Sequence, residues 1–113
     1  MNNDPTKYRK RWFEILNDIL KFQKNESQPD DNELRIIIHN YVFYSKLAIY
    51  EISQTEPNAS CEMANTGLDC SDIILVNFIH SVAHRIGGLQ KTVEIVVNAN
   101  KFNHVDYYKN GGD

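Results

Sequence analysis

The sequence lacks a long apolar run. In a chain of 113 residues, the longest uninterrupted apolar stretches are short segments such as Ile36–Ile38 and Ile73–Val76. A helix that crosses a bilayer needs about 20 apolar residues in succession. The first twelve residues, MNNDPTKYRKRW, also lack the apolar centre of a secretory signal peptide. We therefore expect a cytoplasmic protein that does not enter a membrane.

Cysteine and positive charge are both scarce. The chain has two cysteines, Cys61 and Cys70, and in the cytoplasm both are expected to stay reduced. A short disulfide loop between them is the alternative. Lysine and arginine number 12 against 15 aspartates and glutamates, which gives a formal net charge of -3. A general nucleic-acid binder needs a surplus of positive charge to neutralise phosphates, so the composition argues against one.

The sequence also lacks the common catalytic motifs. It contains no glycine-rich phosphate loop, no GxSxG and no CxxC. Cys70 precedes an expected helix start, where a thiolate is stabilised, but no histidine is placed obviously near it as a base. We therefore expect no enzyme and no cofactor. The hydrophobic fraction of 42% and the charged fraction of 24% are typical of one globular domain spanning residues 1–113.

Three stretches of the chain carry apolar residues at alternating steps of three and four, the spacing of one side of an α-helix. The first begins at Asp4-Pro5, where aspartate can cap the helix and proline suits its first position. It should end by Asn25. Its apolar stripe consists of Tyr8, Trp12, Ile15, Ile19 and Phe22.

The second stretch begins with a capping box formed by Asp30 and Glu33. Its stripe consists of Leu34, Ile38, Tyr41, Ser45, Ala48 and Ile52. Further apolar residues, such as Ile37 and Tyr44, make this helix apolar well beyond one stripe. Such a helix is expected either at the centre of the domain or beneath a second subunit.

The third stretch follows a long loop over residues 54–70 and begins at Ser71-Asp72. Its stripe runs without interruption through Leu75, Ile79, Val82, Ile86, Leu89, Val93 and Val96. The fold class is therefore all-α, an antiparallel bundle of three long helices, or of four if the third breaks at Gly87-Gly88. The unbroken stripe favours a continuous helix of about 48 Å, against about 30 Å for the first. This excess length favours a homo-oligomer, and residues 104–113 are expected to form a frayed tail.

The third helix has a second side that the stripe does not use. His80 and His84 lie one turn apart on it, and they run directly into two glycines that cost a helix interior about 1 kcal/mol each. Small residues here would let another backbone approach closely, with a hinge as the alternative explanation. The predicted partner-binding residues are His80, Ser81, His84, Gly87, Gly88 and Lys91. We call this set the histidine–glycine face.

These observations predict a small interaction or regulatory module that self-associates as a homodimer and also binds a protein partner. The predicted contact surfaces are the second helix and the histidine–glycine face. Two alternatives use the histidines chemically. His80 and His84 have the spacing with which two imidazoles hold a metal ion on one side of a helix.

The other alternative rests on a resemblance. The segment AHRIGGLQKTVEIVV resembles the H-box of sensor histidine kinases, in which a His-Arg pair and an aliphatic residue precede Leu-Gln on a helix. Gly87-Gly88 replace the asparagines usual in that motif. The resemblance implies a phosphotransfer or kinase-derived dimerisation module in which His84 is the phosphorylated residue.

A basic patch occupies the start of the first helix. It consists of Lys7, Arg9, Lys10 and Arg11. Cations in a first helical turn oppose the helix dipole, so this patch needs compensation. An up-down bundle would bring Glu51, Glu56 and Glu62 to the same end of the domain. An acidic partner surface or a nucleic-acid backbone is the alternative.

Overall fold

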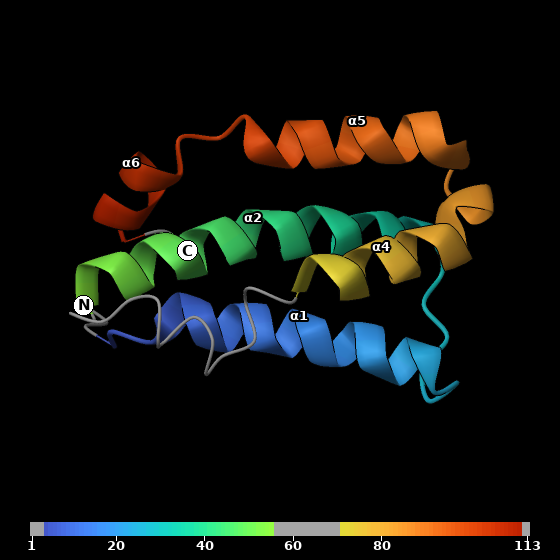
Figure 1. The fold of residues 1–113 in the computed structure, drawn as a ribbon, viewed down its shortest axis with the longest axis horizontal. Coiled ribbons are helices and arrows are strands. Elements are labelled where there is room, and N and C mark those ends of the chain that lie inside the picture. The colour runs from blue at the N-terminus through green and yellow to red at the C-terminus, as the bar shows by residue number, and fades with distance from the viewer. Residues whose placement is uncertain (1–3, 56–70, 112–113) are drawn as a thin grey trace.

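The computed structural model describes residues 4–55 and 71–111. These residues form α1 (Lys7–Gln23), α2 (Asp31–Thr55), α4 (Ser71–Val82), the 3-10 turn η2 (Ala83–Arg85), α5 (Gly88–Asn100) and α6 (His104–Lys109). The helices α1, α2, α4 and α5 run in alternating directions (Figure 1), and the described residues contain no strand. The predicted all-α bundle is confirmed, in its form with four long helices.

Helix α2 lies at the centre of the bundle. It contacts α1, α4, α5 and α6, and α1 and α5 lie on opposite sides of it (Figure 1). Its predicted stripe is buried apart from Ser45, which is half-buried. The extra apolar residues Val42, Phe43 and Tyr44 are buried as well. Most of the wide apolar surface of α2 is therefore covered by helices of the same chain, while Ile36 and Ile49 stay exposed.

The core is built mainly from the predicted stripes of α1 and α2. Trp12 is 1% exposed and packs on Tyr41, with 6.1 Å between the ring centroids. Phe22 at the other end of α1 meets Phe78 of α4 edge-on at 5.5 Å. Burying each large apolar side chain of this kind contributes about 1.5–3 kcal/mol, so this core holds α1, α2 and α4 together.

The starts of α1 and α2 are both fixed by aspartates. In α2, Asp30 Oδ1 accepts the Glu33 amide at 2.8 Å, and Glu33 Oε1 accepts the Asp30 amide at 3.4 Å, which confirms the capping box. Helix α1 begins at Lys7, later than predicted. Asp4 Oδ1 accepts the Thr6 amide at 2.8 Å and the Thr6 hydroxyl at 2.6 Å. This turn stands where the sequence predicts the first helical residues.

The chain end is folded where a frayed tail was predicted. Helix α6 is capped by Asn103, whose Oδ1 accepts the Asp106 amide at 3.1 Å. Its Tyr107 ring meets Phe43 of α2 edge-on at 4.9 Å, and its Tyr108 ring lies 5.6 Å from that of Tyr8 in α1. Aromatic packing against α1 and α2 therefore holds this short helix in place. Residues 112–113 lie outside the described part.

The long loop predicted for residues 54–70 lies outside the described residues, except for Gln54 and Thr55, which complete α2. The two cysteines and two of the predicted acidic partners, Glu56 and Glu62, fall in the same undescribed range. Across the described helices, none combines the length and the apolarity that a membrane-spanning helix requires.

Candidate functional site

The third predicted helix is broken between Val82 and Gly88. The α-helix α4 ends at Val82 and gives way to η2, and α5 begins at Gly88. Gly87 and Gly88 have φ angles of 110° and 91°, in the left-handed region that side chains other than glycine avoid. The prediction of a continuous helix is therefore wrong. Two successive left-handed residues cannot continue one right-handed helix through this point, although the apolar stripe continues past them.

Contacts of the residues that precede Gly87 fix the position of the break. Val82 and Ile86 are fully buried. Arg85 donates from Nε to Asp31 Oδ1 at 2.9 Å and from Nη2 to the carbonyl of Pro29 at 3.0 Å. These bonds tie η2 to the start of α2.

The two glycines have a different role from the one predicted. A Cβ atom built on Gly88 would have no atom within 4 Å, so no other backbone in the described chain approaches closely there. A Cβ on Gly87 would lie 3.1 Å from Lys91 Cβ. The glycines are needed for backbone conformation, and among the described residues no helix makes the predicted close approach at Gly88.

The histidine–glycine face lies at the surface of this break. Its residues His80, Ser81, His84, Gly87 and Lys91 are exposed, and Gly88 is half-buried. Gly87 and Lys91 are neighbours, while His80 and Ser81 belong to α4 and His84 to η2. Ser81 Oγ donates to the carbonyl of Asn77 in its own helix at 2.8 Å. The face therefore spans three elements instead of one side of a single helix.

The described residues add no support to metal binding or phosphotransfer by the histidines. In the described part of the chain, no group of three or more histidine, cysteine, aspartate or glutamate residues is placed to hold a metal ion. For phosphotransfer, the H-box resemblance implies that His84 and Leu89-Gln90 share one helix. Here His84 lies in η2 and Leu89 in α5, on opposite sides of the break.

A second exposed surface lies on α5, and two of its residues, Leu89 and Val93, belong to the apolar stripe predicted from the sequence. At about 100° per residue, Leu89, Val93 and Val97 form one ridge along the outer side of the helix. They are 57%, 59% and 44% exposed. The side of α5 that packs on α2 instead carries Thr92 and Ala99, both buried. We call the ridge Leu89–Val93–Val97 the outer stripe.

The break explains why the outer stripe was missed. Up to Ile86 the predicted heptad residues do face the core. The left-handed glycines then change the direction of the chain. As a result, Leu89 and Val93 face outward, and Thr92 lies on the buried side of α5. The glycine pair was the only sequence signal for the break, because apolar spacing alone does not show where a helix axis changes direction.

The basic patch is compensated within the chain. Glu51, 1% exposed near the end of α2, accepts hydrogen bonds from the Tyr8 amide at 2.9 Å and from the Arg9 amide at 3.1 Å. The Arg9 side chain forms an ion pair with the same carboxylate at 3.1 Å. This pairing confirms the predicted role of Glu51 and supplies a cap for α1 from another helix.

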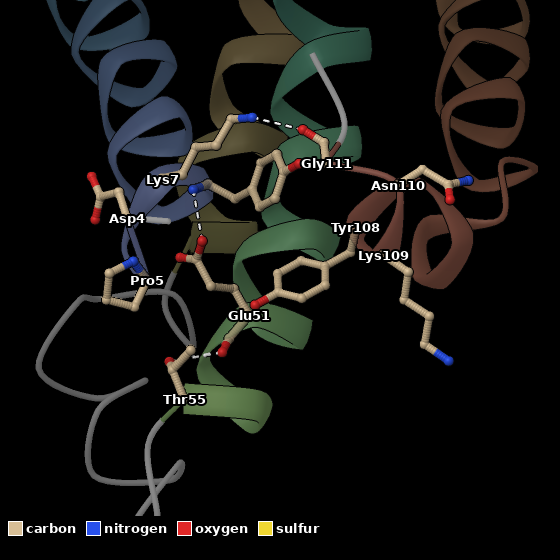
Figure 2. A pocket seen from close by; sticks show the side chains of 10 residues that line it. Asp4, Pro5, Lys7, Glu51, Thr55, Tyr108, Lys109, Asn110 and Gly111 are labelled. Carbon is tan, nitrogen blue, oxygen red and sulfur yellow. Dashed lines mark hydrogen bonds between the residues drawn. The ribbon is translucent and has the colours of Figure 1, made fainter. Parts of the chain in front are cut away.

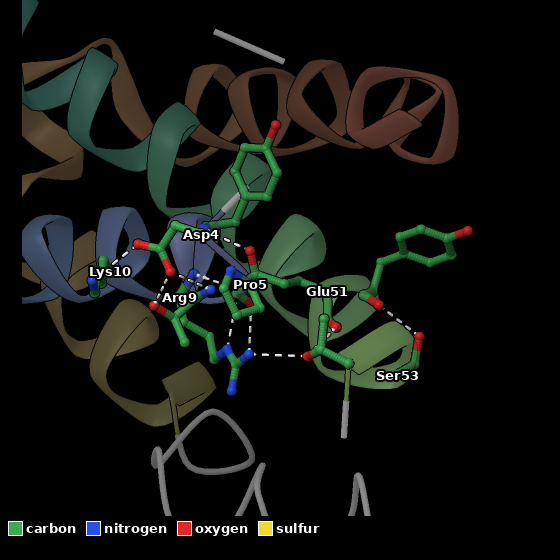
Figure 3. A network of polar contacts seen from close by, with 10 residues as sticks. Asp4, Pro5, Arg9, Lys10, Glu51 and Ser53 are labelled. Atoms are coloured by element: carbon green, nitrogen blue, oxygen red, sulfur yellow. Dashed lines mark hydrogen bonds and ion pairs between the residues drawn. The ribbon is translucent and has the colours of Figure 1, made fainter. Parts of the chain in front are cut away.

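The remaining cations of the patch have nearby partners. Lys10 Nζ lies 2.9 Å from Asp4 Oδ2 (Figure 3). Hydrogen bonds from Thr6 hold the pKa of the Asp4 carboxyl well below its usual range. Arg11 pairs with Glu14 at 3.3 Å. Lys7 Nζ donates to the carbonyl of Gly111 at 2.8 Å. At this one end of the bundle, Lys7 therefore ties α1 to Gly111 and Arg9 ties it to α2.

A cavity of about 490 Å³ lies between α1, α2 and α6 at this end of the bundle (Figure 2). Tyr108 reaches from α6 toward Glu51, whereas Lys109 points away. Burial, followed by the negative charge of Glu51, raises the pKa of the Tyr108 hydroxyl. The Glu51 carboxylate already accepts three N–H donors. The charged group at the base of the cavity is therefore committed to holding α1 and α2 together.

Comparison with known proteins adds no family to these observations. No family model matches the chain, and no curated protein or solved structure matches it significantly.

Proposed function

We propose that the protein is a helical interaction module that docks another helical protein surface along the outer side of α5. The exposure of the outer stripe is the observation that carries this proposal. Its three apolar residues recur every fourth position, so they form a continuous ridge instead of scattered surface positions. A ridge of this kind is what a helix presents to the groove of a partner.

One member of the histidine–glycine face, His84, supplies a polar group near the N-terminal end of this ridge. It is exposed just before the start of α5 and can donate a hydrogen bond or carry charge. Protein interfaces commonly surround an apolar centre with such groups. Helix α2, the other surface expected from the sequence, is left out of the proposal because four helices of its own chain cover most of its apolar residues.

The test uses two aspartate substitutions on α5. Val93→Asp places a charge in the centre of the outer stripe, whereas Asn98→Asp places one at an exposed position about 140° away around the helix. The tagged wild type and each variant are used as bait in a lysate of the native host. We expect Val93→Asp to lose the proteins that wild type and Asn98→Asp both retain. Equal retention by Val93→Asp, or no protein retained by wild type, would refute the proposal.

A further inference from the structure

Helix α6 is attached to the bundle by a small number of side chains. It has six residues, none of them buried, and the exposed residues 101–103 connect it to α5. The rings of His104 and Tyr107 both lie 4.9 Å from that of Phe43 in α2. The ring of Tyr108 lies 5.6 Å from that of Tyr8 in α1. Because a helix this short is not stable by itself, these contacts decide whether α6 stays on the bundle.

Among these rings, that of His104 is the one that can change its charge near neutral pH. It makes a hydrogen bond with the Phe102 backbone that favours the protonated form, so the imidazole is the donor. Its Nε2 is buried and has no hydrogen-bond partner among the described residues. The donor is therefore Nδ1, and the neutral ring carries its lone pair at Nε2. Protonation would place an N–H at this buried position, where no acceptor is available to it.

The surroundings of His104 also oppose a positive charge. Burial, and then the ammonium group of Lys46 on α2, lower the pKa of His104 from its ordinary value of 6.5. The other titratable side chain that α2 brings to these rings is His39, which stacks on Phe43 at 6.0 Å and supplies no negative charge. On α6 itself, Asp106 is hydrogen-bonded at the N-terminal cap of the helix. Within the described residues, no carboxylate forms an ion pair with His104.

We infer that α6 is a pH-sensitive lid, which the protonation of His104 releases from α1 and α2. A charged imidazole is better accommodated in water than beside Phe43, so protonation shifts the population toward a form in which α6 has left the bundle. The docked form is favoured fully above pH 6.5 and loses this advantage as the pH falls toward the lower pKa of the folded state. Opening uncovers the rings of Phe43 and Tyr8, which are 6% and 3% exposed in the docked form. The lid thus controls access to an aromatic surface at this end of the bundle.

Amide hydrogen exchange of the full chain at pH 7.5 and at pH 5 tests the inference. The reporters are the amides of Tyr107 and Asn110, which donate to backbone carbonyls within α6 and its cap. Each rate is divided into that of the unfolded chain at the same pH, which removes the direct effect of pH on exchange. We expect this protection to fall by about fivefold or more at pH 5, the low end of the cost of an unsatisfied buried donor. Amides in the buried middle of α2 should remain far better protected, because α6 opens without them.

Two variants separate the protonation of His104 from other effects of pH. His104→Phe keeps a ring against Phe43 but cannot be protonated, and His104→Gln replaces the ring by an uncharged amide. In both, the protection of α6 should be the same at the two pH values. His39→Gln is the control, since it removes the other histidine beside Phe43 and should keep the wild-type response.

A dye that fluoresces on exposed apolar surface, anilinonaphthalene sulfonate, reports the uncovered rings. Its fluorescence should rise at pH 5 with the wild type and not with His104→Phe. The inference would be overturned if the α6 amides of the wild type were equally protected at both pH values, or if His104→Phe lost the same protection. It would also be overturned if α6 exchanged no faster than the middle of α2, because the opening would then be global. Equal dye binding by the wild type and His104→Phe at pH 5 would show that α6 does not cover the surface that acid exposes.

Discussion

The carboxylate of Glu51, near the end of α2, accepts hydrogen bonds from the backbone amides of Tyr8 and Arg9 in the first turn of α1. Its Oε2 accepts from the Tyr8 amide at 2.9 Å, and its Oε1 accepts from the amide and the Nε of Arg9, both at 3.1 Å. One buried side chain therefore caps α1, pairs with Arg9 and fixes the register of α1 on α2. Thr55 extends the network, accepting from Arg9 Nη2 at 3.0 Å and donating to the Glu51 carbonyl at 2.8 Å.

Replacing Glu51 by glutamine should strongly destabilise the bundle. The amide retains one acceptor oxygen but loses the charge that compensates Arg9, which is itself buried. Removing one partner of a buried ion pair lowers the free energy of unfolding by about 3–5 kcal/mol. We expect the free energy of unfolding, measured in urea, to fall by about 3 kcal/mol.

Glu14→Gln is the matched control for this prediction, since Glu14 pairs with Arg11 on the exposed side of α1. Its loss should cost less than about 1 kcal/mol. Equal effects of the two substitutions would mean that Glu51 does not hold α1 through charge.

A broken third helix and a continuous one predict opposite effects of Gly→Ala substitution on the free energy of unfolding. In a continuous helix, Gly87→Ala and Gly88→Ala would each raise the free energy of unfolding by up to about 1 kcal/mol. At φ angles of 110° and 91°, each alanine should instead lower it by about 1 kcal/mol or more. Urea unfolding of the two variants decides between these outcomes, and an increase in stability would favour the continuous helix.

Gly87→Ala should be the more damaging of the two substitutions. Its Cβ would crowd the Lys91 side chain at 3.1 Å, whereas a Cβ on Gly88 would enter open space. The reverse order of effects would indicate that strain at the start of α5 does not depend on Lys91.

Much of the bundle could be predicted from the sequence because α1 and α2 are regular and packed along their whole length. Trp12 and Ile38 are buried as their spacing requires, and Asp30 forms its capping box with Glu33. Periodicity reports such elements well because one axis persists through the pattern. The pairing of Glu51 with the basic patch followed from the up-down topology alone.

The break at Gly87 and the position of α6 could not be predicted, because both depend on contacts between residues far apart in the sequence. At Gly87 the chain changes direction while the apolar spacing continues, so Leu89 and Val93 were assigned to the core although both are exposed. Helix α6 is too short to be stable by itself, and it folds because Tyr107 and Tyr108 find aromatic partners on other helices. Both features are set by tertiary structure.

Phe43 is the residue on which the docking of α6 most depends. Its ring lies 4.9 Å from those of both His104 and Tyr107, and 5.3 Å from that of Phe102. Phe43→Ala should lower the free energy of unfolding by about 3 kcal/mol or more, since it removes a buried ring. It should also speed amide hydrogen exchange selectively in residues 104–109.

Phe13→Ala serves as the comparison, because Phe13 is an aromatic residue that is 49% exposed on α1. It should cost less stability than Phe43→Ala and leave exchange in α6 unchanged. If exchange in α6 is equally fast in both variants, Phe43 is not its anchor.

We expect His104 to make the stability of the protein depend on pH. Burial, followed by the positive charge of Lys46, lowers its pKa from the ordinary value of 6.5, and the hydrogen bond with the Phe102 backbone only partly opposes this. In the described structure its Nε2 is buried without a hydrogen-bond partner. A protonated imidazole would therefore bring a charge and an unsatisfied donor against Phe43 and Lys46, the groups that α2 presents to it.

The sign of the effect follows from the lowered pKa. Between the pKa of the folded state and 6.5, the unfolded chain binds a proton at His104 that the folded chain does not. The contribution of His104 to stability is thus complete above 6.5 and is lost as the pH falls toward the lower, folded-state value. Measured in urea from pH 7.5 down to pH 5, the free energy of unfolding should fall less in His104→Gln than in the wild type. His80→Gln, which removes an exposed histidine instead, should keep the wild-type slope, and a wild-type slope in His104→Gln would show that the buried imidazole does not couple folding to pH.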